Sequence, residues 1–378
     1  MTGNVYANAM GEAYERLDKL GYERGDGMEL ANHGPMAAEA LSTLGFGGEV
    51  ASWVEDYKRG VVHHDPPVPR FRLDASDARS WREALGRFER AGDWEELFRR
   101  ELADRPWRDV LTQWWPRLVP GLMAGLTHGL IRTAHAVRCL SAADHPDELA
   151  LTELARGLAY WAARYTRLPG DVDFRGERSL TEAITRLGRQ PPVGGVPGGS
   201  RLAKLQENPS YDEALHGLSP LNTGRRLSEM TSTFAGVYLA HPGGLPVPLI
   251  HAVTAPAALR IVLAQLPEDQ HAISVAVMWH VHVTLLVMFT RDTGAERQSL
   301  EKAANTELLP WHDLFDRALV HGDEHIIKFT EACYRENALQ PDPRFAAAVQ
   351  AALQRIPPRA LGGGAATVGK ARQLKEVD

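Results

Sequence analysis

A histidine and a lysine three residues apart, His325 and Lys328, are the pair in this sequence best suited to chemistry. Asp323 can cap a helix start, and apolar residues follow at helical spacing, so both side chains should leave one helix face. His321, one turn earlier, either joins them or stays in the preceding loop. A neutral imidazole can bind a metal, whereas an ammonium group has no lone pair to give. Lys328 is therefore a cation near an anionic substrate or a residue chemically converted into a ligand, unless the helix is amphipathic and both side chains are solvated.

Two further histidines stand at positions that suit a buried site. His33 precedes a predicted helix with Pro35 in its first turn, where the helix dipole favours a neutral, ligand-capable imidazole. A partial helix cap is an equally good interpretation of His33. His251 lies in the apolar segment 246–256, which leads into a predicted helix over 257–266. The default interpretation of His251 is a core histidine bonded to a carbonyl.

The apolar segment 118–138 predicts a helix that carries polar side chains on one face. His128 and His135 are seven residues apart and nearly superposed along that face, with Arg132 between them. Histidine and arginine in an apolar helix need partners when buried. A buried polar site is favoured over a solvated face.

Composition indicates a soluble, cytoplasmic protein. The formal charge of −6, without a run of Lys or Arg, argues against nucleic-acid binding. Cys139 and Cys333 give no disulfide framework, which fits a reducing compartment. The apolar run 273–290 approaches the length of a membrane span, but His280 and His282 in its middle favour a buried helix and no membrane. These two point to different sides of a helix, so at most one can reach a shared site.

Helical periodicity dominates the chain and strand patterns are scarce. We expect an all-α fold: a single large multi-helix domain over residues 1–357 with a metal site between helices. A flexible Gly/Pro-rich loop is predicted at about 188–200, and a disordered tail at 358–378.

Several catalytic signatures are missing from the sequence. It contains no GxGxxG after a strand, no GxxxxGK[ST], no GxSxG and no HExxH, which weakens nucleotide-binding, serine hydrolase and zincin hypotheses. What remains is a set of histidines spread over several helices, together with Lys328. Helical folds build metal sites in this way, and histidine-rich ligand sets suit iron or another late first-row metal.

Four segments together resemble the questin oxidase-like family, and they occur in the family's order. They are Asn32-His33 with Ala40-Leu41, residues 126–131, residues 249–254 and residues 325–328. The resemblance covers most of the chain. It implies an oxygenase acting on an aromatic, quinone-like polyketide, by Baeyer–Villiger-type oxidation or ring cleavage.

The resemblance also implies a site. Its ligands would be four histidines and a carboxylated lysine around one non-haem Fe(II): His33, His128, His251, His325 and Lys328. A lysine buried near a metal has a lowered pKa, and its neutral amine can add carbon dioxide to give a carbamate. Three further residues would orient the substrate or support the ligands: Arg132, His135 and Glu331. The implied partners are O2 and a small aromatic molecule, with NADPH open as a reductant, no flavin, and a homodimer as one option.

Two hypotheses from other classes stay open at this point. A helical metal-dependent phosphohydrolase would need a His-Asp pair such as His312 and Asp313 in its site. A non-catalytic helical binding protein would use its histidines as ordinary core residues.

Overall fold

The fold is almost entirely helical. The computed structural model describes residues 2–25, 30–60, 62–143, 147–189, 202–291 and 294–359. It is 70% helical, which confirms the all-α prediction. Among the described residues the only strands are β1 (Glu23–Arg24) and β2 (Leu30–Ala31), paired antiparallel with Glu23 opposite Ala31. The predicted Gly/Pro-rich loop, from residue 190 on, and the predicted tail, from residue 360 on, lie outside the described residues.

The first half of the chain supplies two of the four helices that surround the site. Its helices are α1 (Thr2–Leu17), α2 (Gly34–Thr43), α3 (Val50–Arg59), α4 (Ala78–Ala84), α5 (Ala91–Asp104), α6 (Trp107–Leu118), α7 (His128–Ser141), α8 (Glu148–Ala163) and α9 (Leu180–Arg186).

The second half supplies the other two. Its helices are α11 (Pro209–His216), α12 (Thr223–Ala240), α13 (Pro246–Leu263), α14 (His271–Phe289), α15 (Gly294–Arg297), α16 (Ser299–Ala304), α17 (Trp311–His321), α18 (Glu324–Leu339) and α19 (Pro343–Arg355).

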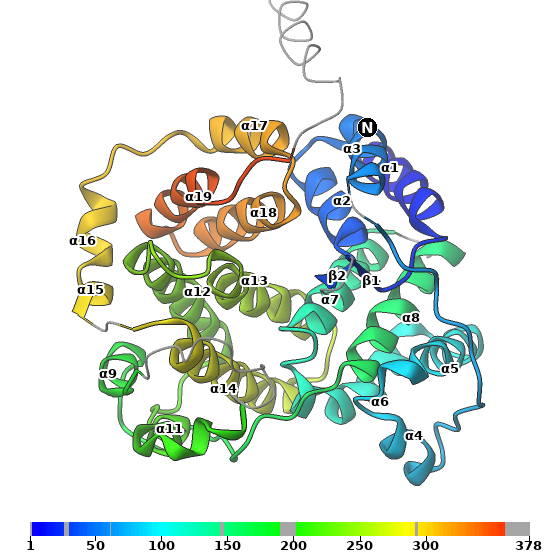
Figure 1. The fold of residues 1–378 in the computed structure, drawn as a ribbon, viewed down its shortest axis with the longest axis horizontal. Helices are drawn as coiled ribbons and strands as arrows, with labels where there is room; N and C mark the ends of the chain where they lie inside the picture. The colour runs from blue at the N-terminus through cyan, green and yellow to red at the C-terminus, as the bar shows by residue number, and fades with distance from the viewer. Residues whose placement is uncertain are drawn as a thin grey trace, which may run out of the picture.

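Four helices from distant parts of the sequence form a closed ring at the centre of the molecule. Helix α2 contacts α7, α7 contacts α13, α13 contacts α18, and α18 contacts α2 again. Figure 1 shows these four helices side by side, with the other helices around them. Each of them begins with, follows or carries one of the histidines predicted as metal ligands, so the ring determines how the site is assembled.

Two prolines inside helices have compensating partners. A proline has no N–H, so the carbonyl four residues earlier loses its helical hydrogen bond. Pro256 lies inside α13, and His282 Nε2 takes up the freed Ala252 carbonyl at 2.7 Å. Pro116 lies inside α6, and Gln270 Nε2 reaches the Thr112 carbonyl at 3.2 Å. The prediction that helix begins only at residue 257 was therefore wrong, because α13 continues through its proline.

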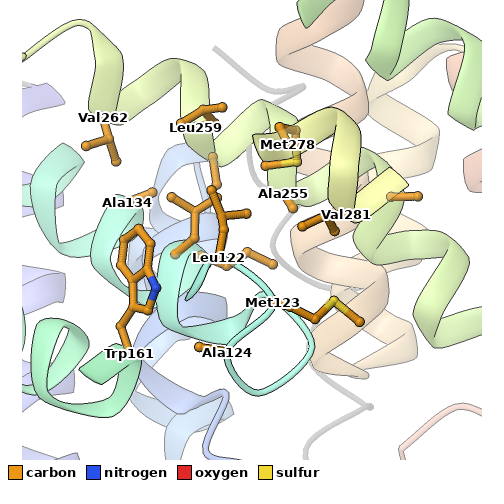
Figure 2. Packing of buried hydrophobic residues seen from close by; sticks show 14 of the residues in the cluster. Leu122, Met123, Ala124, Ala134, Trp161, Ala255, Leu259, Val262, Met278 and Val281 are labelled. Carbon is orange, nitrogen blue, oxygen red and sulfur yellow. The ribbon is translucent and has the colours of Figure 1, made fainter. Parts of the chain in front are cut away.

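The apolar core packs α7, α8, α13 and α14 around the turn that precedes α7. Figure 2 shows Leu122 of this turn between Trp161 of α8 and Met278 of α14, with Met123 and Ala124 of the same turn below it. Gly129 permits the close approach of α7 to α8, since an added Cβ would lie 2.7 Å from the Trp161 Cα. The turn is thus held on several sides before the chain enters α7.

Two helices of the core pass a composition test for membrane spans. They are Pro246–Leu263 and the stretch Glu268–Phe289, with mean hydropathies of 1.5 and 1.9. In the fold, other parts of the protein bury 78% of the first apolar stretch and 72% of the second. Buried core helices of soluble proteins pass the same test, so these two are weak evidence for a membrane.

Candidate metal centre

His33 is held in place by its backbone as well as by packing. It is the residue before α2, with Pro35 in the first helical turn as expected. Its N–H donates to the Tyr57 hydroxyl at 2.8 Å, and that hydroxyl donates to Asn32 Oδ1 at 3.0 Å. Asn32 Oδ1 also accepts from the Gly34 N–H. The imidazole, only 2% exposed, is therefore positioned by a polar network on the side away from the site.

A strained left-handed turn positions two more histidines. Gly125, Leu126 and Thr127 have φ values of +55°, +57° and +70°, and α7 begins only at His128. The expected helix over 118–138 is therefore interrupted. Left-handed backbone is unfavourable for Leu and Thr, and such strain persists where the surroundings enforce it, often at functional sites.

The carbonyls of this turn face the rings of His128 and His251. The Gly125 carbonyl accepts from His128 Nδ1 at 2.5 Å, and the Leu126 carbonyl accepts from His251 Nδ1 at 2.6 Å. An Nδ1–H donated to a carbonyl leaves Nε2 with a free lone pair. In both histidines Nε2 is therefore the ligand-capable atom, and His251 Nε2 is buried without a hydrogen-bond partner. The expectation that His251 is a core histidine bonded to a carbonyl holds for Nδ1 but does not account for Nε2.

Helix α18 contributes His325 and Lys328. Asp323 caps its N-terminus as predicted, accepting from the N–H groups of His325 and Ile326. Lys328 is 2% exposed, and its Nζ has no hydrogen-bond partner. Burial lowers the pKa of Lys328 to about 7, although Glu324 and Asp323 act to raise it. A substantial share of the amine is therefore neutral near physiological pH.

The four histidines converge on one point. One nitrogen from each of His33, His128, His251 and His325 lies within 4.8 Å of the others, and the Nε2 atoms of His33 and His128 are 2.7 Å apart. Burial, reinforced by neighbouring positive charges that include Lys328, lowers the pKa of His33, His128 and His251 well below the ordinary value. Imidazole nitrogens that converge in this way fit a metal ion.

Carboxylates lie at the edge of the cluster but already have partners. Asp323 and Glu324 form a second potential metal-binding group with His325. Asp323 Oδ1 caps α18, whereas Glu324 pairs with Arg24 and Arg359. Glu324 Oε1 lies 4.0 Å from His33 Nδ1. The cluster therefore has four histidines directed inward, and Lys328 is its buried charged group without a polar partner.

A mainly apolar cavity opens onto the histidines. Its volume is about 820 Å³, within the range typical of small-molecule sites. His33, His128 and His325 line it together with Gly125 and Leu126 of the strained turn and with the start of α13. The remaining wall includes Met288 and Phe289 of α14. A small molecule in this cavity would lie beside the histidine cluster.

Comparison with known proteins identifies the family. A family model described as questin oxidase-like matches residues 30–333, most of the chain. The chain belongs to the questin oxidase-like family. All five predicted ligands fall inside the matched region. No curated protein matches the sequence. Membership of the questin oxidase-like family makes the protein an oxidoreductase and suggests an oxidase of aromatic polyketides.

Arg132 is placed away from the cavity of this questin oxidase-like protein. Its Nε and Nη2 donate to the two oxygens of Glu153 on α8, at 2.6 and 2.8 Å, and its guanidinium lies over the Tyr22 ring. Arg132 does not line the cavity described above. The expectation that a buried arginine on α7 needs partners is met by an ion pair, while its catalytic role stays a prediction.

His135 and Glu331 meet in a buried ion-pair network. His135 Nδ1 lies 2.6 Å from Glu39 Oε2 on α2, and Arg138 pairs with both Glu39 and Glu331 on α18. This network joins α2, α7 and α18, three of the four ring helices. Its members do not line the cavity, so their roles in catalysis stay predictions.

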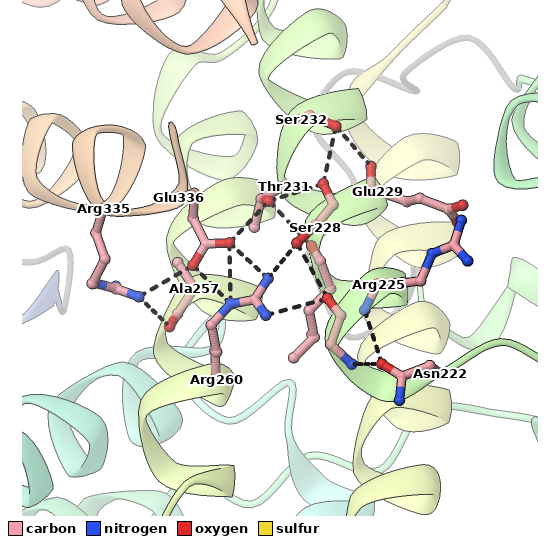
Figure 3. A network of polar contacts seen from close by, with 12 residues as sticks. Asn222, Arg225, Ser228, Glu229, Thr231, Ser232, Ala257, Arg260, Arg335 and Glu336 are labelled. Carbon is pink, nitrogen blue, oxygen red and sulfur yellow. Dashed lines mark hydrogen bonds and ion pairs between the residues drawn. The ribbon is translucent and has the colours of Figure 1, made fainter. Parts of the chain in front are cut away.

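A second network fixes α13 against α18. Arg260 of α13 forms a partly buried ion pair with Glu336 of α18, at 2.9 Å, and Thr231 of α12 donates to the same carboxylate. Arg335 donates to the Ala257 carbonyl of α13 at 3.1 Å. Figure 3 shows these contacts between the three helices. With the previous network, they connect the histidine-bearing helices through charge as well as through apolar packing.

The other histidines named from the sequence lie outside the cluster. His280 and His282 bond to Tyr211 and to the Ala252 carbonyl, so neither reaches the shared site. His321 ends α17 and bonds to the Ile356 carbonyl. The His312 and Asp313 side chains are 65% and 40% exposed, and neither lines the cavity. Their position offers no support for the phosphohydrolase hypothesis.

Sequence reasoning missed the groups that act through the backbone or across long separations. Nothing in Leu126-Thr127 signals a left-handed turn, since both residues disfavour it. Glu324 was passed over, although it stands next to His325 and is almost fully buried. The carboxylate of Glu324 at the start of an otherwise apolar helix could have indicated a buried ion pair. Its two arginine partners, however, lie 300 and 35 residues away in the chain.

Proposed function

We propose that the protein is a non-haem iron oxygenase that oxidises an aromatic, quinone-like polyketide with O2, by Baeyer–Villiger-type oxidation or ring cleavage. The observation that carries the proposal is the convergence of four imidazoles, three of which line a mainly apolar cavity. Family membership supports the oxidative reaction class.

The ligand set favours iron over the hard divalent cations. Magnesium and calcium prefer oxygen ligands, whereas His33, His128, His251 and His325 offer nitrogen. Among imidazole-binding metals, iron is one that exchanges electrons with O2, as an oxidase requires. Bound iron would supply the electron exchange with O2 that a closed-shell aromatic substrate does not make readily by itself.

Lys328 completes the proposed ligand set as a carbamate. Its amine, with a pKa of about 7, has the lone pair needed to attack the carbon of CO2. The new N–C bond forms, one proton leaves the nitrogen to solvent, and the product carries one negative charge. That charge would replace the ammonium cation of Lys328. The cation would repel the metal, and its charge lowers the pKa of His33, His128 and His251.

The protein's own residues would bind the substrate and exclude water. The apolar cavity wall would hold the flat face of an aromatic ring system beside the histidines. The carbonyls of Gly125 and Leu126 would keep His128 and His251 in the tautomer that directs Nε2 to the metal. The ion-pair networks would keep the four helices in register.

Oxygen uptake tests the function directly. Protein reconstituted with ferrous iron is mixed with emodin, a hydroxylated anthraquinone, and with related anthraquinones, with and without NADPH as the two-electron reductant that insertion of one oxygen atom requires, and O2 consumption and product mass are measured. We expect uptake that depends on substrate and is lost in His251→Ala, while the control His312→Ala retains it. Labelled O2 distinguishes incorporation of one oxygen atom from two. Iron-loaded, folded wild type that consumes no O2 with any of these substrates would contradict the proposal.

The carbamate has its own test. After incubation with carbon-labelled bicarbonate, carbon NMR of the wild type should show a carbamate resonance that Lys328→Met lacks. A wild-type spectrum without this resonance in protein loaded with diamagnetic zinc would show that Lys328 is not carboxylated and would remove the carbamate from the ligand set.

A further inference from the structure

The cavity contains a second polar group besides the histidines. Glu23 of β1, Tyr160 of α8 and Arg164 at the end of α8 all line it. Arg164 Nε donates to Glu23 Oε1 at 2.7 Å, and its Nη2 donates to Glu23 Oε2. Tyr160 donates to Glu23 Oε1 at 3.1 Å. Among otherwise mainly apolar walls, this triad is a distinct place for a polar substituent.

Two members of the triad are buried, whereas its guanidinium is partly exposed and lines the cavity. Glu23 and Tyr160 are 3% and 2% exposed, whereas the Arg164 side chain is 33% exposed. The guanidinium lies 3.9 Å from the centroid of the Phe88 ring, which fixes its plane. Arg164 Nη1 makes no hydrogen bond with the described part of the chain, so its two N–H groups are open to a ligand.

The hydrogen-bonding capacity that remains in the triad has a particular pattern. Glu23 Oε1 already accepts two bonds, but Glu23 Oε2 accepts only one. Burial, with the nearby Glu23 carboxylate, raises the pKa of Tyr160, so its hydroxyl stays protonated and committed to Glu23. The triad can therefore still donate through Arg164 Nη1 and accept through Glu23 Oε2.

We propose that Glu23 and Arg164 bind a phenolic hydroxyl of the aromatic substrate, with Tyr160 holding Glu23 in position. A phenol can accept from Arg164 Nη1 and donate to Glu23 Oε2 at the same time. Glu23 neutralises Arg164, so the pair favours a neutral hydroxyl over an additional anion in this mainly apolar cavity. This assignment rests on the proposed function for its substrate class and makes Arg164 a specificity-determining residue.

The triad is also linked to the histidine cluster. A Cβ added to Gly125 would lie 2.9 Å from the Tyr160 hydroxyl, and the Gly125 carbonyl holds His128. A ring system held by its hydroxyl at Arg164 would therefore share the cavity with a fixed set of histidines. A substrate without the hydroxyl would lack this contact and would bind in several orientations.

Binding measured without turnover tests this inference separately from the iron chemistry. Emodin and its fully O-methylated ether are titrated into metal-free protein, and their absorbance changes are followed. We expect the wild type to bind emodin about tenfold more tightly than the ether, because a site built for a hydroxyl leaves Glu23 and Arg164 unpaired with the ether.

Variants assign this preference to the triad. The Glu23→Gln/Arg164→Met double variant avoids an unpaired buried carboxylate and should bind both compounds with nearly equal affinity, and Arg164→Lys should restore part of the preference. Arg167→Met, at an exposed arginine outside the cavity, should behave like wild type. A folded double variant that keeps the full preference, or a wild type without it, would overturn the inference. Neither result would affect the oxygen-uptake test, since iron binding does not involve Arg164.

Discussion

The Nε2 atoms of His33 and His128 lie 2.7 Å apart, although 95 residues separate them in the chain. Two lone pairs repel at this distance, so a proton or a metal ion must lie between the rings. His128 Nδ1 is committed to the Gly125 carbonyl, which leaves its Nε2 as an acceptor. Without metal, His33 should therefore carry its proton on Nε2, while its Nδ1 lacks a hydrogen-bond partner.

Metal binding should move the His33 proton. When Nε2 becomes a ligand, the proton of the neutral ring has to sit on Nδ1, which faces Glu324 at 4.0 Å. Nitrogen NMR of labelled protein, with and without diamagnetic zinc, should show the His33 tautomer change while His251 keeps Nδ1–H. An unchanged His33 tautomer on zinc binding would exclude its Nε2 as a ligand.

The strained turn should be sensitive to one methyl group. Gly125→Ala forces a Cβ into left-handed backbone and against Tyr160, so we expect a loss of about 1–2 kcal/mol in the free energy of unfolding and weaker metal binding. Gly11→Ala, inside α1 with nothing within 4 Å of the new Cβ, should instead stabilise by up to about 1 kcal/mol. Urea denaturation and metal titration measure both. Equal stability and affinity in Gly125→Ala and wild type would show that the turn does not position the site.

The metal-free protein should lose stability as the pH falls. Burial lowers the pKa of His33, His128 and His251 in the folded state, whereas in the unfolded chain they titrate near 6.5. Below that pH the unfolded chain binds more protons, so the free energy of unfolding decreases, by up to about 1.4 kcal/mol per pH unit for each histidine. Lys328 also lowers the free energy of unfolding as the pH falls, but at higher pH, between its folded pKa of about 7 and its ordinary value of 10.5.

Urea denaturation of metal-free protein between about pH 7 and pH 5 checks this slope. His251→Gln should have a slope smaller by about one proton. A wild-type stability that is flat over this range, or that rises toward acid, would mean that the histidines are protonated in the fold.

The buried network around Glu39 should contribute strongly to stability. Although burial alone would raise it, Arg138 and His135 lower the pKa of Glu39, which keeps it ionised. Glu39→Gln leaves Arg138 with one remaining carboxylate, so we expect a loss of about 3–5 kcal/mol, measured by urea denaturation. Glu12→Gln, at an exposed ion pair on α1, is the matched control and should unfold like wild type. If Glu39→Gln also unfolds like wild type, the network does not hold the ring of helices.

The sequence was informative where residue types combined with the resemblance to a known family. That resemblance named His33, His128, His251 and His325 as ligands, and the fold brings them together. The tertiary partners were not predictable. Glu153 for Arg132 and Glu39 for His135 lie on other helices, and no local pattern links them.

Backbone conformation was the second feature that the sequence did not predict. Pro256 suggested a helix boundary, but His282 from α14 supplies the hydrogen bond that makes a continuous helix possible. Likewise, apolar periodicity predicted helix through Leu126, where the left-handed turn is enforced by contacts with distant segments. In both cases a tertiary interaction overrides local preference.

Iron content tests the central claim most directly. Protein purified without a histidine tag, and reconstituted once with ferrous iron, is analysed for metals together with His251→Ala, Lys328→Met and the control His312→Ala, an exposed histidine outside the cluster. We predict about one iron per chain in the wild type and in the control, and its loss in the other two variants. Folded wild type that binds no iron, or iron retained in both His251→Ala and Lys328→Met, would contradict the five-ligand site.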